Sequence, residues 1–238
     1  MSPNTSQDPA EAAKRRAAHW AAAQVEDGMA VGLGSGSTSA LVIDEIGRRV
    51  RDGLRIVGIA TSLQSHRQAE SLGIPLTDFA RQPQLDLTID GADEVQRGTL
   101  SLIKGHGGAL LREKIVAMAS RRMLVAVDPR KVVDQLGSIF TVPVEIVPFG
   151  WETTERRLRD LGFASELRRN DDGKPYVTDG QHYILHCKLI ESGLTPEQAA
   201  DALKRTTGVV EHGLFLGIAS KIVIGSAEKV DFLERTQS

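Results

Sequence analysis

Short apolar runs alternate with helix-forming segments through the first half of the chain. The runs with the length and composition of buried strands are 29–33, 54–60, 74–77, 85–90, 100–103 and 123–127. Helices are predicted before and between them, ending near residues 25, 51, 71 and 121. Because buried strands that alternate with helices usually pair in parallel, this pattern predicts an α/β protein with a mainly parallel sheet flanked by helices.

The pattern changes after about Gly137. Strands are predicted at 142–147, 164–168, 176–177, 182–189 and 209–215, with helices at 151–161 and 195–206. The order βαββαβ is typical of a small ferredoxin-like α+β domain. A strand at 220–224 and a final helix at 227–235 are expected to rejoin the first sheet. We therefore predict a Rossmann-like catalytic domain, formed by residues 1–136 plus 213–238, and a ferredoxin-like domain at 137–212.

Composition and charge narrow the class of protein. Apolar residues make up 41% of the 238 residues and aromatic residues only 4%, which suits an aliphatic α/β core. The net charge of −2 gives no reason to expect nucleic acid or a membrane surface as partner. Cys187, the one cysteine, excludes an intramolecular disulfide. No apolar run approaches the length of a membrane helix and no signal-peptide core is present, so we expect a cytoplasmic protein.

Polar turns follow the predicted strands. They are 35–38, 61–62, 90–93, 104–107 and 128–131. In an open parallel sheet the carboxyl ends of the strands lie at one edge, where ligands bind. The sequence therefore predicts a single cleft lined by these turns.

The first turn, Gly34-Ser35-Gly36-Ser37-Thr38, is suited to a phosphate, because glycine N–H groups and hydroxyls converge at a helix N-terminus. A dinucleotide-binding loop is disfavoured, since Ser37 stands where the third glycine belongs. A Walker loop is excluded by the lack of Gly-Lys-Ser/Thr. An ordinary strand-to-helix turn remains an equal alternative on this motif alone.

Two aspartates, Asp90 and Asp93, flank a tight turn through Gly91 and Ala92. Their carboxylates could bind sugar hydroxyls, position a proton or hold a divalent metal. Asp-Gly is also a common turn pair, which leaves a structural reading open. No histidine cluster at ligand spacing lies nearby, so a metal site is the weaker alternative.

The segment from Lys104 to Lys114 joins a strand end, a glycine turn and a helix. Lys104 and the following glycines can hold an anion, and Glu113 could move a proton. The predicted apolar stripe of the helix is Leu111, Ile115 and Met118. Glu113 lies away from that stripe, and a helical glutamate in such a position usually faces solvent. Only its place near the strand ends directs it toward the predicted cleft.

Five motifs, taken in chain order, resemble type A ribose-5-phosphate isomerase. Gly34–Thr38 is similar to that family's GTGST loop, Asp90–Glu94 matches DGADE, and KGHGGALLREK at 104–114 resembles KGGGAALTREK. Asp128–Lys131 resembles its lysine-containing segment, and 208–215 resembles PGVV…GLF. The chain departs from the pattern at Ser35 and Leu111, each in place of threonine, and at His106 in place of glycine.

The resemblance implies an aldose–ketose isomerase of the non-oxidative pentose phosphate pathway that converts D-ribose 5-phosphate to D-ribulose 5-phosphate through an enediolate. It implies Glu113 as general base, Lys104 as oxyanion stabiliser, and Asp90 and Asp93 as ligands of the sugar hydroxyls that assist ring opening. The other residues expected at the substrate are Lys14, Ser35, Gly36, Ser37, Thr38, Gly91, Ala92, Gly105, His106, Gly107 and Lys131. It further implies a sugar phosphate as partner, no cofactor or metal, and a homodimer or homotetramer.

Two other functions remain open from the residues. A sugar-phosphate lactonase or deaminating isomerase on a similar sheet would need a different catalytic group, for which His106 is the one candidate in the turns. A non-catalytic sugar-phosphate sensor would keep the phosphate loop and could lose the base. The joint presence of Lys104, Asp90, Asp93 and Glu113 argues against the sensor.

Overall fold

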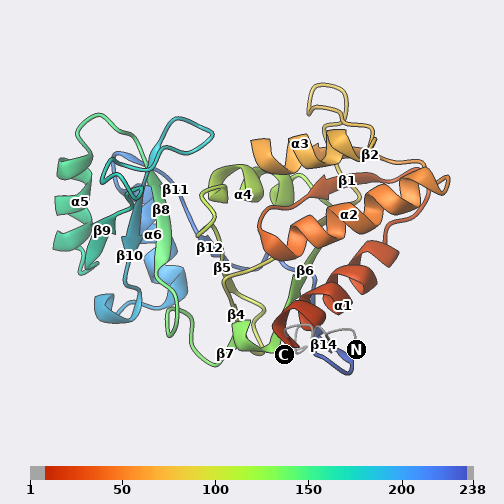
Figure 1. Ribbon diagram of the computed structural model, residues 1–238. Helices are drawn as coiled ribbons and strands as arrows, with labels where there is room; N and C mark the ends of the chain where they lie inside the picture. Colours follow the sequence, from red (N-terminus) through yellow and green to blue (C-terminus); the bar gives the residue numbers. More distant parts are fainter. Residues whose placement is uncertain (1–8, 235–238) are drawn as a thin grey trace, which may run out of the picture.

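The computed structural model describes residues 9–234. Its largest sheet, called the central sheet below, has six strands and lies in the right half of Figure 1. Its strands, in spatial order, are β14 (Val230–Leu233), β13 (Lys221–Gly225), β6 (Met123–Val127), β3 (Leu87–Asp90), β1 (Ala30–Leu33) and β2 (Val57–Ala60). Only β14 is antiparallel to its neighbour. The predicted mainly parallel sheet is confirmed.

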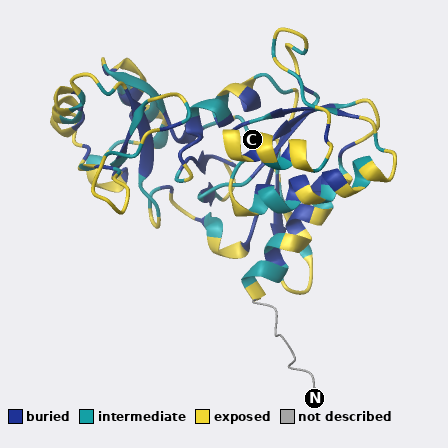
Figure 2. Cartoon of the chain, turned by 45° about the horizontal axis from the view of Figure 1, so that its top comes forward, coloured by how far each residue is buried: buried dark blue, intermediate teal, exposed yellow. Residues whose placement is uncertain are grey.

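Helices cover both faces of this sheet. They are α1 (Pro9–Ala23), α2 (Ser37–Arg51), α3 (Leu63–Ser71) and α4 (Leu110–Met118). Along β6, Leu124 and Ala126 point into the cluster that contains α1 and α2, while Met123, Val125 and Val127 point into the cluster that contains α4. This alternation explains why the strands are apolar throughout: both of their faces are buried. Figure 2 shows the buried strands between helices whose outer faces are exposed.

A second, antiparallel sheet lies beside the first, in the left half of Figure 1. Its strands, in spatial order, are β11 (Val209–His212), β8 (Val142–Ile146), β10 (Tyr183–Cys187) and β9 (Ser165–Leu167). Helices α5 (Trp151–Asp160) and α6 (Pro196–Arg205) complete the chain order βαββαβ, as predicted. A short 3₁₀ helix at Ile190–Ser192 precedes α6. The domain boundaries given above stay predictions.

A third sheet, which the sequence pattern did not indicate, lies between the other two. Its short strands, in spatial order, are β12 (Leu214–Phe215), β5 (Leu102–Ile103), β4 (Glu94–Gln96) and β7 (Val132–Val133). The Lys104 turn thus follows a strand of this sheet and not of the central one. Its main chain is fixed by a residue distant in sequence, because Lys104 N donates to Gly213 O at 2.9 Å. A Cβ on Gly213 would lie 2.1 Å from Lys104 O, so only glycine allows this approach.

Several predicted elements are wrong. The final helix at 227–235 is instead strand β14, reached through a tight hairpin in which Lys229 N donates to Ser226 Oγ at 3.0 Å; residue 235 lies outside the described residues. The predicted strand at 74–77 forms only a single bridge, between Leu76 and Gly58, and 176–177 is not a strand. The predicted strand 209–215 is divided at Gly213 between two sheets.

Glu94, fully buried at the start of β4, fastens the loop that leads into the second sheet. Its carboxylate accepts hydrogen bonds from the main-chain N–H groups of Gly137, Ile139 and Phe140, each at 2.6 Å. Glu94 therefore holds residues 137–140 in place.

We expect Glu94→Ala to lower the free energy of unfolding by about 3 kcal/mol, because three main-chain donors would lose their shared, fully buried acceptor. Urea unfolding followed by circular dichroism measures the change. Glu70→Ala, an exposed glutamate on α3, is the matched control and should stay within about 0.5 kcal/mol of the unchanged protein. Equal stability of the two variants would contradict this role of Glu94.

No helix in the described part of the chain is both long enough and apolar enough to cross a membrane.

Candidate active site

A cavity of about 210 Å³ opens where the turns after β1, β3, β5 and β6 meet. Most of the residues expected at the substrate line it: Lys14, Ser35, Gly36, Ser37, Thr38, Gly91, Ala92, Asp93, Lys104, Gly105, Gly107, Glu113 and Lys131. Val127, Asp128 and Arg130 complete the lining. Asp90 and His106 are not in this lining. The predicted convergence of the polar turns is therefore confirmed for four of them, while Thr61 and Ser62 lie behind the first turn.

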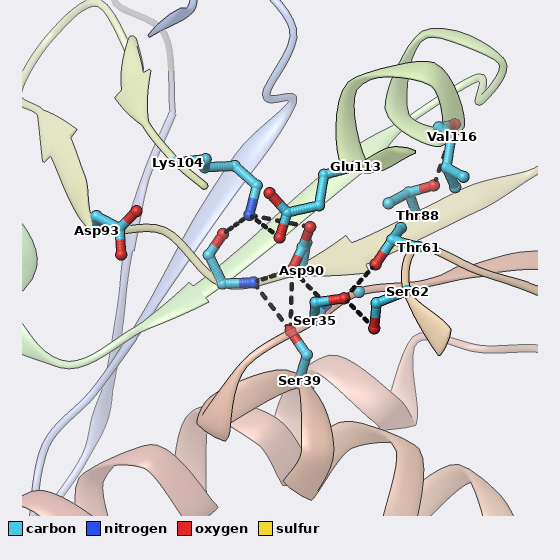
Figure 3. Close-up of polar contacts among 12 residues, drawn as sticks. Ser35, Ser39, Thr61, Ser62, Thr88, Asp90, Asp93, Lys104, Glu113 and Val116 are labelled. Carbon is cyan, nitrogen blue, oxygen red and sulfur yellow. Dashed lines mark hydrogen bonds and ion pairs between the residues drawn. The ribbon is translucent and has the colours of Figure 1, made fainter. Parts of the chain in front are cut away.

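Lys104 is the charged centre of the site. Its ammonium lies 2.9 Å from Asp90 Oδ2 and 3.4 Å from Glu113 Oε1, and it donates to Gly91 O at 2.6 Å. The side chains of all three charged residues are almost fully buried, and they converge from separate elements (Figure 3). Burial lowers the pKa of Lys104, but attraction to Asp90 and Glu113 outweighs burial and raises that pKa above its ordinary value. Lys104 is thus a fixed cation at neutral pH.

Asp90 forms an ion pair with Lys104 and does not itself line the cavity. Its Oδ1 accepts hydrogen bonds from Ser35 N at 3.0 Å, Ser39 Oγ at 3.0 Å and Gly91 N at 2.8 Å. Gly34 allows this packing, because a Cβ there would lie 2.3 Å from Asp90 Oδ1. With one oxygen on three donors and the other on Lys104, Asp90 connects the first turn to the ammonium and does not face the cavity.

Glu113 extends from the first turn of α4 into the cavity wall. Its Oε2 is buried and has no hydrogen-bond partner in the described part of the chain. Burial raises the pKa of Glu113 to about 8, because the lowering effect of Lys104 is smaller and both Asp90 and Asp93 add to the rise. A carboxylate in this state can accept and release a proton near neutral pH.

The predicted apolar stripe of α4 is wrong. Ile115 and Met118 are 49% and 68% exposed, whereas Leu110, Glu113, Val116 and Ala117 are buried. The face toward the sheet carries these residues at helical spacing, and Glu113 belongs to it. Glu113 therefore points inward for a simple geometric reason, contrary to the expectation for an isolated helical glutamate.

The first turn offers backbone donors to an anion. Gly36 adopts φ +91° and precedes α2, whose N-terminal N–H groups face the cavity edge. The Ser35 hydroxyl is used for anchoring: it lies 2.7 Å from Thr61 Oγ1, 2.8 Å from Ser62 Oγ and 3.0 Å from Ser65 Oγ. These contacts explain why the turn after β2 is polar although it does not line the cavity.

Cationic side chains surround the same end of the cavity. Lys14 Nζ donates to Ser37 Oγ at 3.1 Å, and Lys131 Nζ lies 4.3 Å from the centroid of the Phe140 ring. Arg130, which the motif analysis did not single out, lies beside Lys131 in the 3₁₀ helix Pro129–Lys131. Its guanidinium binds Asp128 at 2.9 and 3.1 Å. In the sequence, Arg130 could have been identified from its position directly before Lys131, since the two form a basic pair.

Asp93 and His106 meet through the main chain. His106 N donates to Asp93 Oδ2 at 3.1 Å and so fixes the Asp93 carboxylate. Asp93 is one of three acidic residues in the lining, with Glu113 and Asp128. The His106 ring points out of the cavity, and its Nε2 lies 2.8 Å from Thr141 O. His106 does not have a positive φ, so the backbone here accepts a residue other than glycine.

The fold and the site define a class: an α/β enzyme in which a buried lysine–carboxylate group adjoins a cation-lined cavity suited to a small phosphorylated sugar. Comparison with known proteins makes this specific. Residues 57–229 match the family model of ribose 5-phosphate isomerase A (phosphoriboisomerase A). A ribose-5-phosphate isomerase A from Synechococcus sp. (strain JA-3-3Ab) is 47% identical over 95% of this chain and 99% of its own. The ribose-5-phosphate isomerase A from Gloeobacter violaceus is 51% identical over 92% of this chain and 95% of its own.

Solved structures agree with these sequence relatives. Ribose 5-phosphate isomerase A from Methanocaldococcus jannaschii superposes with a TM-score of 0.90 at 35% identity, over 94% of this chain and 99% of the other. A D-ribose-5-phosphate isomerase solved in complex with phospho-erythronic acid superposes with a TM-score of 0.90 at 36% identity, over 95% of this chain and 99% of the other.

The chain belongs to the ribose 5-phosphate isomerase A family. It is an isomerase that interconverts ribose 5-phosphate and ribulose 5-phosphate in the pentose phosphate pathway. The family, fold class and activity predicted from the sequence are confirmed, and the lactonase, deaminating-isomerase and sensor alternatives are set aside.

Proposed function

We propose that Glu113 is the general base of the isomerisation. The observation that supports this role is the unpartnered, buried Oε2 beside the fixed charge of Lys104. In the open-chain aldose, Glu113 takes the proton from C2, the C–H electron pair forms the C1=C2 bond, and the C1 carbonyl oxygen becomes negative. Lys104 stabilises that oxygen. The hydroxyl proton then passes from O2 to O1, and Glu113 returns its proton to C1 as the C2 carbonyl forms.

The phosphate end of the substrate lies, in this proposal, against the Ser35–Thr38 turn, Lys14 and Lys131. Helix N-terminal N–H groups and two ammonium groups supply the complementary charge. A relative of known structure binds phospho-erythronic acid, a phosphorylated sugar acid, and we propose that this chain binds sugar phosphates in the corresponding cavity. Such a pose directs the reacting carbons toward Lys104 and Glu113.

The two aspartates differ in their proposed roles. Asp93 lines the cavity and contacts sugar hydroxyls, where it can assist ring opening. Asp90 acts through Lys104, because its oxygens are held by Lys104 and three other donors. Lys104 supplies the positive charge at the reacting oxygen, so the proposed steps require no cofactor.

The pH dependence of the reaction tests the role of Glu113. A base must be ionised, and the pKa of about 8 means that most of Glu113 carries a proton below pH 8. We expect kcat/KM to rise about tenfold per pH unit between pH 6 and 7.5 and to level off above about pH 8. Initial rates with ribose 5-phosphate at constant ionic strength measure the profile. A flat or falling profile over that range would contradict Glu113 as the base.

The oligomeric state and cellular location remain proposals. We propose a homodimer or homotetramer, because exposed apolar side chains such as Ile115, Met118 and the 94% exposed Phe149 offer surface that a second copy would bury. Sedimentation velocity distinguishes these states from a monomer, and a monomer at micromolar concentration would contradict the proposal. A cytoplasmic location stays a prediction.

A further inference from the structure

His106 is the residue of the active-site turn that the mechanism leaves without a role. Its ring points away from the cavity and packs against the rings of Phe140 and His186. The ring lies edge-on to Phe140, with centroids 5.0 Å apart at 70°, and lies tilted against the His186 ring, with centroids 4.7 Å apart at 33°. Because Nε2 lies 2.8 Å from the carbonyl oxygen of Thr141, that nitrogen carries the proton and the ring orientation is fixed.

Phe140 connects His106 to the phosphate end of the cavity. Its main-chain N–H is held by Glu94 at 2.6 Å, so the backbone cannot shift freely. Its ring has two further neighbours: the edge contact with His106 and the ammonium of Lys131, 4.3 Å from the ring centroid. A cation over an aromatic face is attracted to it, so the position of this ring sets the position of the Lys131 ammonium.

We propose that His106 is a positioning residue for substrate binding: through Phe140 it sets the place of the Lys131 ammonium, while its N–H holds Asp93. The proposal rests on the phosphate-binding role proposed above for Lys131. One residue thereby connects the sugar end of the cavity to its phosphate end. Glycine, the residue expected here from the family pattern, has no ring with which to do this.

The neighbouring histidine supports this arrangement. Burial, with smaller effects of His106 and Arg168, lowers the pKa of His186 to about 4, so His186 is neutral at pH 7. Its Nδ1 lies 3.1 Å from Thr141 Oγ1. A neutral ring held at Nδ1 permits this close contact with His106 without repulsion between like charges.

Steady-state kinetics with inorganic phosphate as competitive inhibitor test the proposal. His106→Ala should raise the KM for ribose 5-phosphate and the Ki for phosphate together, by about three- to fivefold, and change kcat less than about twofold. His106→Phe, which keeps a ring edge against Phe140, should restore most of the phosphate affinity. His182→Ala is the control, because His182 pairs with Glu145 in the second sheet and does not line the cavity; its Ki should not change.

A double-mutant cycle distinguishes the proposal from its premise. Lys131→Ala alone should raise the Ki, and His106→Ala should add nothing on that background. An unchanged Ki in Lys131→Ala would overturn the phosphate role of Lys131 and the inference with it. Two results would overturn the inference but keep the phosphate role of Lys131, provided that Lys131→Ala raises the Ki. In the first, His106→Ala has no effect on the Ki in either background. In the second, it raises the Ki by the same factor in both. If His106→Ala does not fold, Phe140→Leu replaces it in the cycle with the same expected results.

Discussion

Glu113→Gln is expected to lower kcat by about 10³-fold or more while ribose 5-phosphate still binds. Glutamine has nearly the same shape as glutamate but cannot accept the C2 proton. The phosphate contacts proposed at Ser35–Thr38 and Lys131 do not involve the Glu113 side chain, so the substitution should leave them intact. Turnover is measured by ketose formation, and binding by isothermal titration calorimetry.

Exchange of the C2 hydrogen provides a second measurement for Glu113. In deuterated water, NMR should detect exchange between substrate and solvent with the unchanged enzyme and almost none with Glu113→Gln. Glu166→Gln, an exposed glutamate of β9, serves as matched control and should retain full turnover. Normal turnover by Glu113→Gln would rule out the proposed base.

Lys104→Met should lower kcat by about 10²- to 10³-fold, because the developing oxyanion would lose its fixed cation. The variant should also shift the pH profile. Lys104 lowers the pKa of Glu113, so its removal raises that pKa, and the rising limb of kcat/KM should move to higher pH. Initial rates across pH 6–10 measure both effects.

A lysine in a surface pair is the control for Lys104. Lys188 pairs with Glu191 at 2.7 Å and is exposed, so Lys188→Met should leave kcat and the pH profile unchanged. Because Lys104→Met leaves two carboxylates buried together, circular dichroism must show that the variant is folded; Lys104→Gln replaces it otherwise. Retained kcat with an unshifted profile would contradict the role of Lys104.

Sequence patterns predicted the central sheet well because buried parallel strands are apolar along their whole length. The run 123–127 is an example: it is β6 at the centre of the sheet. The run 100–103 predicted β5 but not the sheet to which it belongs, and other strands of two or three residues, such as β4 and β7, carry too few side chains for any period to show. The third sheet, which places Lys104, was therefore beyond prediction from periodicity.

Within the site, sequence reasoning found residue types more readily than orientations. Glu113 was directed toward the cleft only by its place near the strand ends and by motif resemblance, because the stripe of Ile115 and Met118 suggested the opposite helix face as the buried one. Asp90 and Asp93 appeared equivalent in the sequence, yet the structure places one behind Lys104 and the other in the cavity lining. Such differences depend on tertiary contacts that periodicity does not encode.

The contact between Lys104 and Gly213 has a consequence for synthesis of the chain. Lys104 N donates to Gly213 O, and β5 pairs with β12, which begins one residue later. A nascent chain that ends before residue 213 therefore contains Glu113, Asp90 and Lys104 but lacks the main-chain partners that fix the lysine. Contacts between such distant residues form slowly, since the intervening loop must close first. Catalytic competence on the ribosome thus arises only after the second sheet has been translated.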